Sequence, residues 1–202
     1  MDSMNRRAVL KLLTSAPMAA GFALTDAEAR QAHAHAQAAR EAARTSGTAF
    51  KPQFFTEHEY QTVRILSDQI IPKDERSGGA IDAGVPEFMD FILIDQPSRQ
   101  VAMRGGLAWL DRESQQRFDK TFVAAADAER RQILDEVSTS EEIDPALSHG
   151  QAFFRSFRDL TSSGFWTSKM GIEDLGYVGN TFVAEWNGCP PEVLKKLGLS
   201  AD

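Results

Sequence analysis

The side chains that most often carry acid–base or metal chemistry are sparse in this chain. It has four histidines, and His33 and His35 are separated by one residue, a spacing that could give a metal ion two ligands. Without further ligands beside them, we interpret this pair as part of a linker. His58, in the expected first turn of a helix, and His149, beside a loop, remain for proton transfer. We expect neither to be catalytic.

Adjacent carboxylates are the second candidate for chemistry. Glu141-Glu142 and Glu173-Asp174 could bind calcium or act as an acid and a base. Neither pair has the ligand spacing of an EF-hand, and neighbouring acids on loops are more often solvated surface. The sequence also lacks the glycine-rich nucleotide motifs, the G-x-S-x-G motif and the H-E-x-x-H motif. We therefore predict no catalytic residue, no metal site and no cofactor bound by the chain itself.

Cys189 is the only cysteine of the chain. A single thiol excludes the cysteine frameworks of iron–sulfur clusters and of c-type haem attachment, and it cannot form a disulfide within the chain. Pro190 and Pro191 follow it and predict a turn. We expect Cys189 to be a small buried residue at that turn; a reactive or intermolecular thiol is the alternative.

The beginning of the chain has the features of an export signal. Arg6 and Arg7 precede a weakly apolar, uncharged run over residues 12–25. Paired arginines before such a run are typical of a twin-arginine signal, which directs folded proteins through the twin-arginine translocase to the periplasm. The run is too short and too rich in small polar residues to be a good membrane span. An amphipathic start of a soluble helix is the alternative interpretation.

Small residues after this run predict where the signal is removed. Ala-Glu-Ala at 27–29 suggests a leader over residues 1–29 that is cleaved after Ala29. Two further A-x-A sites end at Ala34 and Ala36. Export in the folded state suits a protein that carries a cofactor or travels bound to one that does.

The composition and length indicate a single acidic domain. The 202 residues carry a net charge of −7, without a basic stripe interleaved with aromatic residues, so we expect no nucleic-acid partner. Residues 30–53 are polar and alanine-rich and show no apolar period. We predict a tether there, disordered or helical only against a partner. The folded domain is expected over residues 54–202.

Helical periodicity recurs through this domain. Thr56 and Glu59 have the spacing of a capping box at the start of a helix. Pro72 cannot continue a helix, so we predict a helix over 56–71. Its apolar stripe is Val63, Leu66 and Ile70. Further helices are predicted over 86–95, over 98–110, from about Ser114, from a cap at Asp127 and over about 153–164. Loops are predicted over 73–84 and over 138–150. No segment alternates as a strand does, so the predicted fold class is all-α with long ordered loops.

The expected inward residues follow from the same spacing. They are Phe88, Phe91, Ile92 and Ile94; Val101, Leu107 and Leu110; Ile133, Leu134 and Val137; and Phe153, Phe154, Phe157 and Leu160. Gly105 and Gly106 lie inside one of these helices, where each glycine costs about 1 kcal/mol relative to alanine. Such a pair indicates either close packing or a frayed helix.

The last third of the domain combines aromatic residues with glycines. Large side chains presented on glycine-rich turns are favoured at protein–protein interfaces. The interface residues predicted from this segment are Phe165, Trp166, Tyr177, Asn180, Trp186 and Asn187. The alternative is that the rings cover the protein's own core.

Two segments resemble a known family. They are ILSDQIIPKDERSGGAIDAGVPEFMD at 65–90 and GFWTSKMGIEDLGYVGNTFVAEWNGCP at 164–190. With the arginine-bearing leader, they are similar to gluconate 2-dehydrogenase subunit 3, the small non-catalytic subunit of membrane-associated bacterial sugar dehydrogenases. The resemblance covers about residues 54–191 and leaves out the predicted tether.

The resemblance implies a partner that carries the redox chemistry. In this family the small helical subunit joins a large FAD-binding flavoprotein of the glucose–methanol–choline (GMC) type and accompanies it through twin-arginine export. A c-type cytochrome subunit with haem c, or another carrier, then accepts the electrons, and the complex is membrane-associated in the periplasm. The substrates of such complexes include gluconate, glucose, fructose and glucosides. A stand-alone periplasmic enzyme or ligand-binding protein is the alternative hypothesis.

Overall fold

The computed structural model describes residues 24–139, 145–176, 185 and 188–199. All regular secondary structure within these ranges is helical, which confirms the predicted all-α class. The elements are α2 (Asp26–Ser46), α3 (Glu57–Ile70), α4 (Ala80–Ala83), α5 (Val85–Asp95), η1 (Pro97–Arg99), α6 (Gln100–Phe118), α7 (Asp127–Thr139), α8 (Ser148–Trp166), α9 (Lys169–Asp174) and α10 (Pro191–Lys196). Among the described residues, no helix is both long and apolar enough to cross a bilayer.

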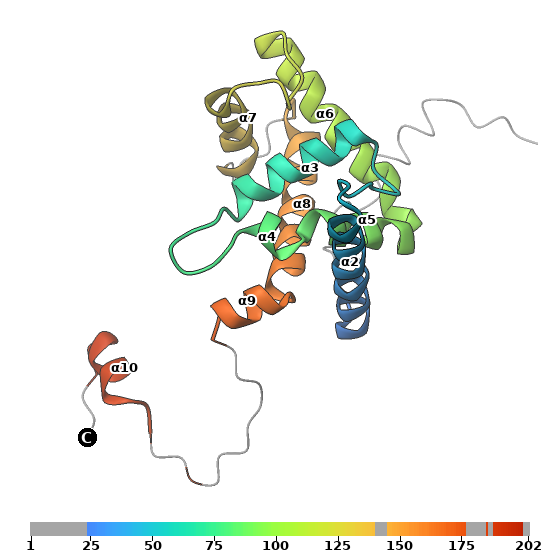
Figure 1. The fold of residues 1–202 in the computed structure, drawn as a ribbon. Helices are drawn as coiled ribbons and strands as arrows, with labels where there is room; N and C mark the ends of the chain where they lie inside the picture. The colour runs from blue at the N-terminus through green and yellow to red at the C-terminus, as the bar shows by residue number, and fades with distance from the viewer. Residues whose placement is uncertain (1–23, 140–144, 177–184, 186–187, 200–202) are drawn as a thin grey trace, which may run out of the picture.

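Helix α8 is the central element of the fold (Figure 1), and it packs against α2, α3, α4, α5, α6, α7 and α9. Phe153, Phe157 and Leu160 recur along it at the spacing of one helix face and are buried, as predicted. They meet Phe88 and Leu93 of α5 in a single hydrophobic cluster. The helix continues through Gly164, where a Cβ atom would lie 2.9 Å from the Phe88 ring. Gly164 therefore permits close helix packing and does not end the helix.

Helix α3 forms where the sequence predicted it. The Thr56 backbone amide donates to Glu59 Oε2 over 2.8 Å, and the Glu59 amide donates to the Thr56 hydroxyl over 3.2 Å. This reciprocal pair satisfies two amides that lack a partner inside the helix. Val63 and Leu66 are completely buried against the core. The stripe thus fixes the face that α3 turns toward α5, α6 and α8.

Helix α5 confirms the predicted helix behind Pro86. Phe88 and Ile92 are buried, whereas Ile94, predicted to point inward, is 41% exposed. The preceding residue, Gly84, has a φ of 81°, a left-handed conformation that favours glycine. The short helix α4 lies just before it, inside the segment over 73–84 that the sequence predicted as a loop.

Helix α6 corrects the prediction of two helices over this region. It runs without interruption to Phe118, and Ser114, expected to start a second helix, is buried within its C-terminal half. Leu107 and Leu110 face the core as predicted, but Val101 is 77% exposed and does not. The next helix, α7, buries its predicted stripe of Ile133, Leu134 and Val137. Asp127 is the first residue of α7 and not its cap.

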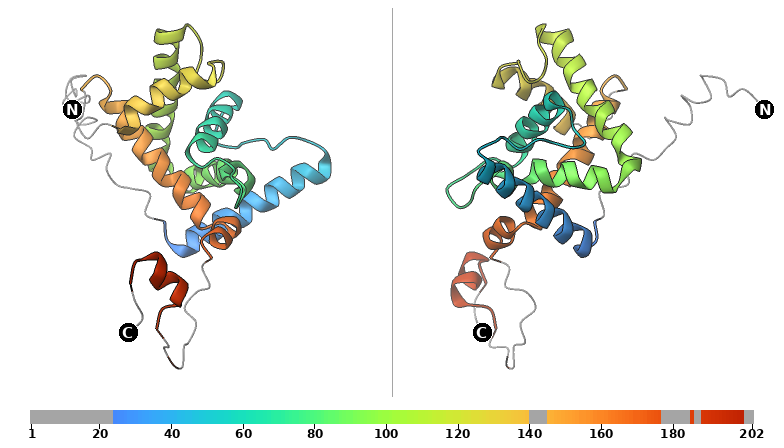
Figure 2. Two further views of the ribbon diagram at one scale, coloured as in Figure 1. Left: turned by 90° about the vertical axis from the view of Figure 1, so that its left-hand side faces the viewer. Right: turned by 45° about the vertical axis from the view of Figure 1, so that its right-hand side comes forward.

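Helix α2 shows that the tether prediction was wrong for most of residues 30–53. Thr25 and Glu28 form a capping box at its start, and Gly47 ends it in a left-handed conformation. Ala29, Ala32 and Ala36 form its buried stripe. Such small side chains let α2 lie directly on α5 and α8 (Figures 1 and 2), so the helix is part of the folded body. The predicted leader and its cleavage after Ala29 stay predictions, and Arg6 and Arg7 lie outside the described residues.

Candidate functional site

The structure divides the predicted interface residues into three groups. Phe165 is completely buried and belongs to the core, which is the alternative that the sequence left open. Trp166, next to it, is 38% exposed and packs edge-on against the Phe165 ring. The others, Tyr177, Asn180, Trp186 and Asn187, lie outside the described residues.

Trp166, at the end of α8, is followed along the chain by two more exposed apolar side chains, one on α9 and one at its C-terminal cap. Ile172 is 39% exposed and Leu175 is 60% exposed. We call Trp166, Ile172 and Leu175 the α8–α9 patch. Large apolar side chains that are exposed on neighbouring turns are candidates for a site where another protein binds.

A tight turn between α8 and α9 holds this patch in place. The Ser168 hydroxyl donates to the Phe165 carbonyl over 2.6 Å and accepts from the Gly171 amide over 3.0 Å. A Cβ atom at Gly171 would lie 2.1 Å from the Phe165 carbonyl oxygen, so only glycine allows this approach. Arg76, in the loop between α3 and α4, also holds the end of α9, because its guanidinium donates a hydrogen bond to the Asp174 carbonyl oxygen over 2.7 Å. The patch is therefore carried by an ordered turn.

The histidines do not come together in a site. His33 is buried and stacks on Phe88, while His35 is exposed and stacks on Phe91. His58 is half-exposed and pairs with Asp111, whose other oxygen accepts the Phe122 amide. His149 is exposed and lines a cavity of about 200 Å³ between α6 and α8. No group of three potential metal ligands occurs in the described ranges.

The predicted carboxylate pair Glu173-Asp174 forms ion pairs with neighbouring basic side chains. Glu173 is exposed and lies 3.8 Å from Lys169, and Asp174 pairs with Arg76 over 3.2 Å. Glu141-Glu142 lies outside the described residues. Cys189, predicted to be buried, is exposed beside Gly188, whose φ is 82°. The turn is therefore present, but it does not fold back on the core.

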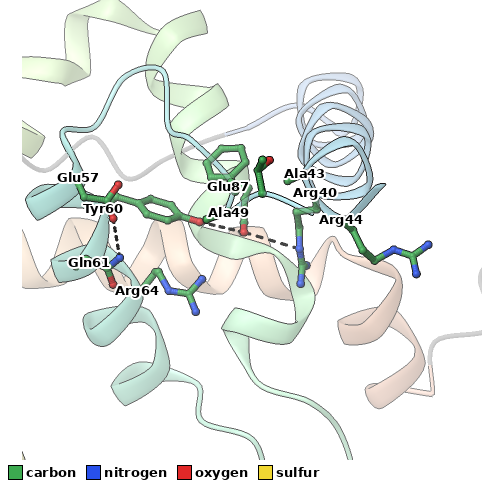
Figure 3. A pocket seen from close by; sticks show the side chains of 11 residues that line it. Arg40, Ala43, Arg44, Ala49, Glu57, Tyr60, Gln61, Arg64 and Glu87 are labelled. Atoms are coloured by element: carbon green, nitrogen blue, oxygen red, sulfur yellow. Dashed lines mark hydrogen bonds and ion pairs between the residues drawn. The ribbon is translucent and has the colours of Figure 1, made fainter. Parts of the chain in front are cut away.

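A buried polar cluster that the sequence did not predict centres on Glu87. Although glutamate is almost never fully buried unless it is paired, this side chain is only 6% exposed. Its Oε1 accepts a hydrogen bond from the Tyr60 hydroxyl over 3.0 Å and lies 3.8 Å from Arg40 Nε. Arg40 is itself held by the Asp82 carbonyl oxygen, to which it donates over 3.0 Å. Helices α2, α3 and α5 each supply one member of this Arg40–Glu87–Tyr60 cluster (Figure 3).

The cluster opens into a cavity of about 460 Å³. We call it the Tyr60–Glu87 cavity, and its other polar lining residues are Arg44, Thr48, Glu57, Gln61 and Arg64. Burial and the neighbouring Glu87 carboxylate raise the pKa of Tyr60. The Tyr60 hydroxyl therefore keeps its proton at neutral pH and remains a hydrogen-bond donor to Glu87.

Only weak sequence signals point to this cluster. Arg40, Tyr60 and Glu87 lie far apart in the sequence and share no motif. Glu87 follows Pro86 in the first turn of a helix, where an acidic residue is common for its favourable interaction with the helix dipole. The packing of α2, which the sequence did not predict, brings Arg40 to it.

Comparison with known proteins identifies a family for more than half of the chain. Residues 57–186 match the family model for gluconate 2-dehydrogenase subunit 3. The match includes α3 to α9 and the α8–α9 patch, whereas α2 precedes it. No curated protein and no solved structure matches the chain significantly.

Proposed function

Because the chain belongs to the gluconate 2-dehydrogenase subunit 3 family, we propose that it is the non-catalytic small subunit of a sugar or sugar-acid dehydrogenase complex. Its main partner in this proposal is a large GMC-type flavoprotein that holds FAD and carries out the oxidation. A c-type cytochrome subunit, with haem c, takes the electrons onward. The complex works in the periplasm, where it is associated with the membrane.

The proposed task of this chain is to escort the flavoprotein and to stabilise it. Arg6 and Arg7 form the signal that the twin-arginine translocase recognises. Because this translocase transports folded proteins, a partner without a leader of its own can cross the membrane while bound to this chain. After export, the small subunit remains attached. A partner that binds only the folded flavoprotein adds roughly 2.7 kcal/mol to its stability at 100 times the dissociation constant.

The observation that carries this proposal is the α8–α9 patch. Trp166, Ile172 and Leu175 expose apolar surface within the segment that matches the family. The Ser168 cap and Gly171 hold them on an ordered turn, so binding does not need to order them first. Preorganised aromatic and aliphatic anchors are what a lasting interface requires.

Substitution of the two arginines tests the escort role in the native host. With Arg6→Lys and Arg7→Lys together, we expect flavin-dependent sugar dehydrogenase activity to move from the periplasmic fraction to the cytoplasm. Arg30→Lys, an equally conservative change on the exposed side of α2, is the control and should leave activity in the periplasm. Normal periplasmic activity with the double substitution would rule out the escort role.

A further inference from the structure

Two arginines from different helices converge on the Tyr60–Glu87 cavity. Arg40 belongs to α2 and Arg64 to α3, and both line the cavity. In Figure 3 the Arg64 side chain extends toward the Arg40 side chain, whereas Arg44, the third arginine of the lining, points away from both. The Arg44 guanidinium is also occupied by Glu41, which lies 2.7 Å away. Arg40 and Arg64 are therefore the two cations that can act together on one ligand.

The fold fixes the position of the Arg40 guanidinium. Its Nη1 donates a hydrogen bond to the Asp82 carbonyl oxygen over 3.0 Å. A Cβ atom at Gly84 would lie 2.7 Å from the same nitrogen, so the glycine leaves the space that the guanidinium occupies. Arg40 Nε lies 3.8 Å from Glu87 Oε1, which is an ion pair beyond hydrogen-bond distance. Arg40 is thus held in place while N–H groups remain for a further partner.

Arg64 has no counter-charge among the described residues. It is half-buried, and its guanidinium carbon lies 5.9 Å from the centre of the Tyr60 ring. No described carboxylate forms an ion pair with it. Glu57, which also lines the cavity, stands seven residues earlier on α3, about 10 Å away along the helix axis. That carboxylate accepts a hydrogen bond from Gln61 Nε2 over 2.9 Å instead.

The cavity lining is more positive than the protein as a whole. Three arginines and two glutamates line it, whereas the chain carries a net charge of −7. The buried Glu87 compensates Arg40 and leaves Arg64, on the other helix, without a partner. An anion bound between the two guanidinium groups would supply the missing charge.

The placement of these two groups on separate helices favours a tetrahedral anion. A carboxylate has two oxygens, and one arginine can occupy both through parallel hydrogen bonds. A phosphate monoester has three terminal oxygens and nearly two negative charges at neutral pH, so it can accept from both arginines at once. We propose that the Tyr60–Glu87 cavity binds a phosphate monoester, whose phosphate group lies between Arg40 and Arg64.

The rest of the cavity leaves room for the esterified part of the ligand. Its volume of about 460 Å³ lies within the range of small-molecule sites. Thr48 offers a hydroxyl group, and Ala49 and Phe50 offer apolar contacts. The site uses α2, which precedes the segment that matches the family, and it does not depend on the proposed function of the α8–α9 patch.

Calorimetric titration of the full-length chain at neutral pH and constant ionic strength tests this inference. The probes are glycerol 3-phosphate, acetate and glycerol, which separate the phosphate from a carboxylate and from the hydroxyl groups. We expect saturable binding of glycerol 3-phosphate, with acetate and glycerol at least about tenfold weaker, because neither can join the two guanidinium groups. Equal binding of acetate, or no saturable binding of glycerol 3-phosphate, would overturn the proposal.

Two substitutions place the binding in the cavity. Arg40→Gln and Arg64→Gln each remove one of the two guanidinium groups and should weaken the binding of glycerol 3-phosphate by about tenfold. Arg131→Gln on α7, outside the cavity lining, is the matched control and should bind as the wild type does.

Circular dichroism shows whether each variant retains the helical fold. Arg40→Gln leaves the buried Glu87 without its positive partner, so this variant can lose stability. Arg64→Gln then decides alone, since Arg64 is partly exposed on the surface of α3. Unchanged binding of glycerol 3-phosphate in a folded Arg64→Gln variant would contradict the site.

Vesicles distinguish a lipid headgroup from a soluble ester as the source of the phosphate. Phosphatidylcholine vesicles with and without phosphatidate, whose headgroup is a phosphate monoester, are sedimented with the full-length chain. Co-sedimentation that requires phosphatidate and is lost in Arg64→Gln would assign a lipid headgroup. Binding of glycerol 3-phosphate without co-sedimentation would assign a soluble ester, and either result supports the phosphate site.

Discussion

His33 on α2 donates a hydrogen bond from Nε2 to the hydroxyl oxygen of Thr167, just beyond the end of α8, over 2.9 Å. The Thr167 hydroxyl donates its own proton to the Ser163 carbonyl oxygen, 2.6 Å away, so its oxygen is left to accept. This network assigns the proton of neutral His33 to Nε2. It joins α2 to the C-terminal end of α8, next to the α8–α9 patch.

This contact predicts a loss of stability at acid pH. Burial lowers the pKa of His33 in the folded protein, whereas unfolded histidine titrates near its ordinary value of about 6.5. Below that pH the unfolded state binds more protons than the folded state, so stability is complete above it and falls as the pH drops toward the lowered pKa. We expect the melting temperature to decrease between about pH 7.5 and about pH 5.5.

Two histidine variants separate this effect from general acid denaturation. His33→Gln should flatten the dependence of melting temperature on pH in that range. His35→Gln, on the exposed side of the same helix, should leave it unchanged. An equally steep dependence in His33→Gln would show that His33 is not responsible.

The neighbouring glycines of α6 provide a second prediction with its own control. A Cβ atom at Gly106 would lie 1.8 Å from Phe153 Cδ2, whereas one at Gly105 would meet nothing within 4 Å. Gly106→Ala should lower the free energy of unfolding by about 1–3 kcal/mol because Phe153 cannot move without disturbing the core. Gly105→Ala should raise it by about 0.5–1 kcal/mol through helix propensity. Urea denaturation measures both, and a similar effect of the two changes would refute the close contact of α6 with α8.

The start of α2 predicts where a leader can be removed. A twin-arginine leader is cut from a protein that has already folded, and a peptidase needs an extended segment. Ala29 is only 3% exposed inside α2, behind the capping box of Thr25 and Glu28. Loss of that capping box alone would lower the stability of the protein by about 0.5–2 kcal/mol. We therefore expect cleavage upstream of Thr25, in place of the cut after Ala29 that the sequence suggested.

Intact-mass analysis of the chain recovered from the periplasm locates the cut. Gly21-Phe22-Ala23 is the nearest small-residue motif upstream of α2, so a mature chain that begins at Leu24 is the expected product. A mature N-terminus at Arg30, His35 or Gln37 would show that the peptidase acts inside the helix and would contradict this prediction.

The adjacent rings of Phe165 and Trp166 predict opposite effects of the same substitution. Trp166→Ala removes an exposed anchor of the α8–α9 patch, so it should weaken capture of the flavoprotein by about 2 kcal/mol with little change in melting temperature. Phe165→Ala empties a fully buried site and should cost about 3–5 kcal/mol of stability. Co-purification and thermal melting of both variants provide the comparison. A Trp166→Ala variant that melts early yet still captures the flavoprotein would place the tryptophan in the core.

The sequence predicted those helices whose buried stripe consists of large apolar residues. Val63 and Leu66 with the Thr56 cap identified α3, and Phe153 and Phe157 identified α8. Helix α2 was not predicted as part of the folded domain because its buried stripe consists of Ala29, Ala32 and Ala36. These side chains have little apolar surface, but they fit closely against α5. The alanines recur in the sequence at helical spacing. This spacing alone does not show that the face is buried, because burial depends on the surface of α5 that packs against it.

The polar cluster could not be predicted for a related reason. Arg40, Tyr60 and Glu87 come together only through the packing of α2 on α5, and α2 was expected to be a tether. Cys189 shows the reverse case, since the following prolines indicated a turn correctly but did not indicate that the turn stays exposed. Local signals specify the path of the chain, whereas burial depends on which elements meet.

Affinity capture of the tagged full-length chain from native membranes tests whether the chain is the small subunit of a flavin-dependent dehydrogenase complex. We expect that a large subunit with the absorbance spectrum of a flavin co-elutes, that the complex oxidises a sugar or sugar acid, and that the small subunit alone does not. An isolated, flavin-free chain that oxidises a carbohydrate unaided would contradict the proposed role as a non-catalytic subunit.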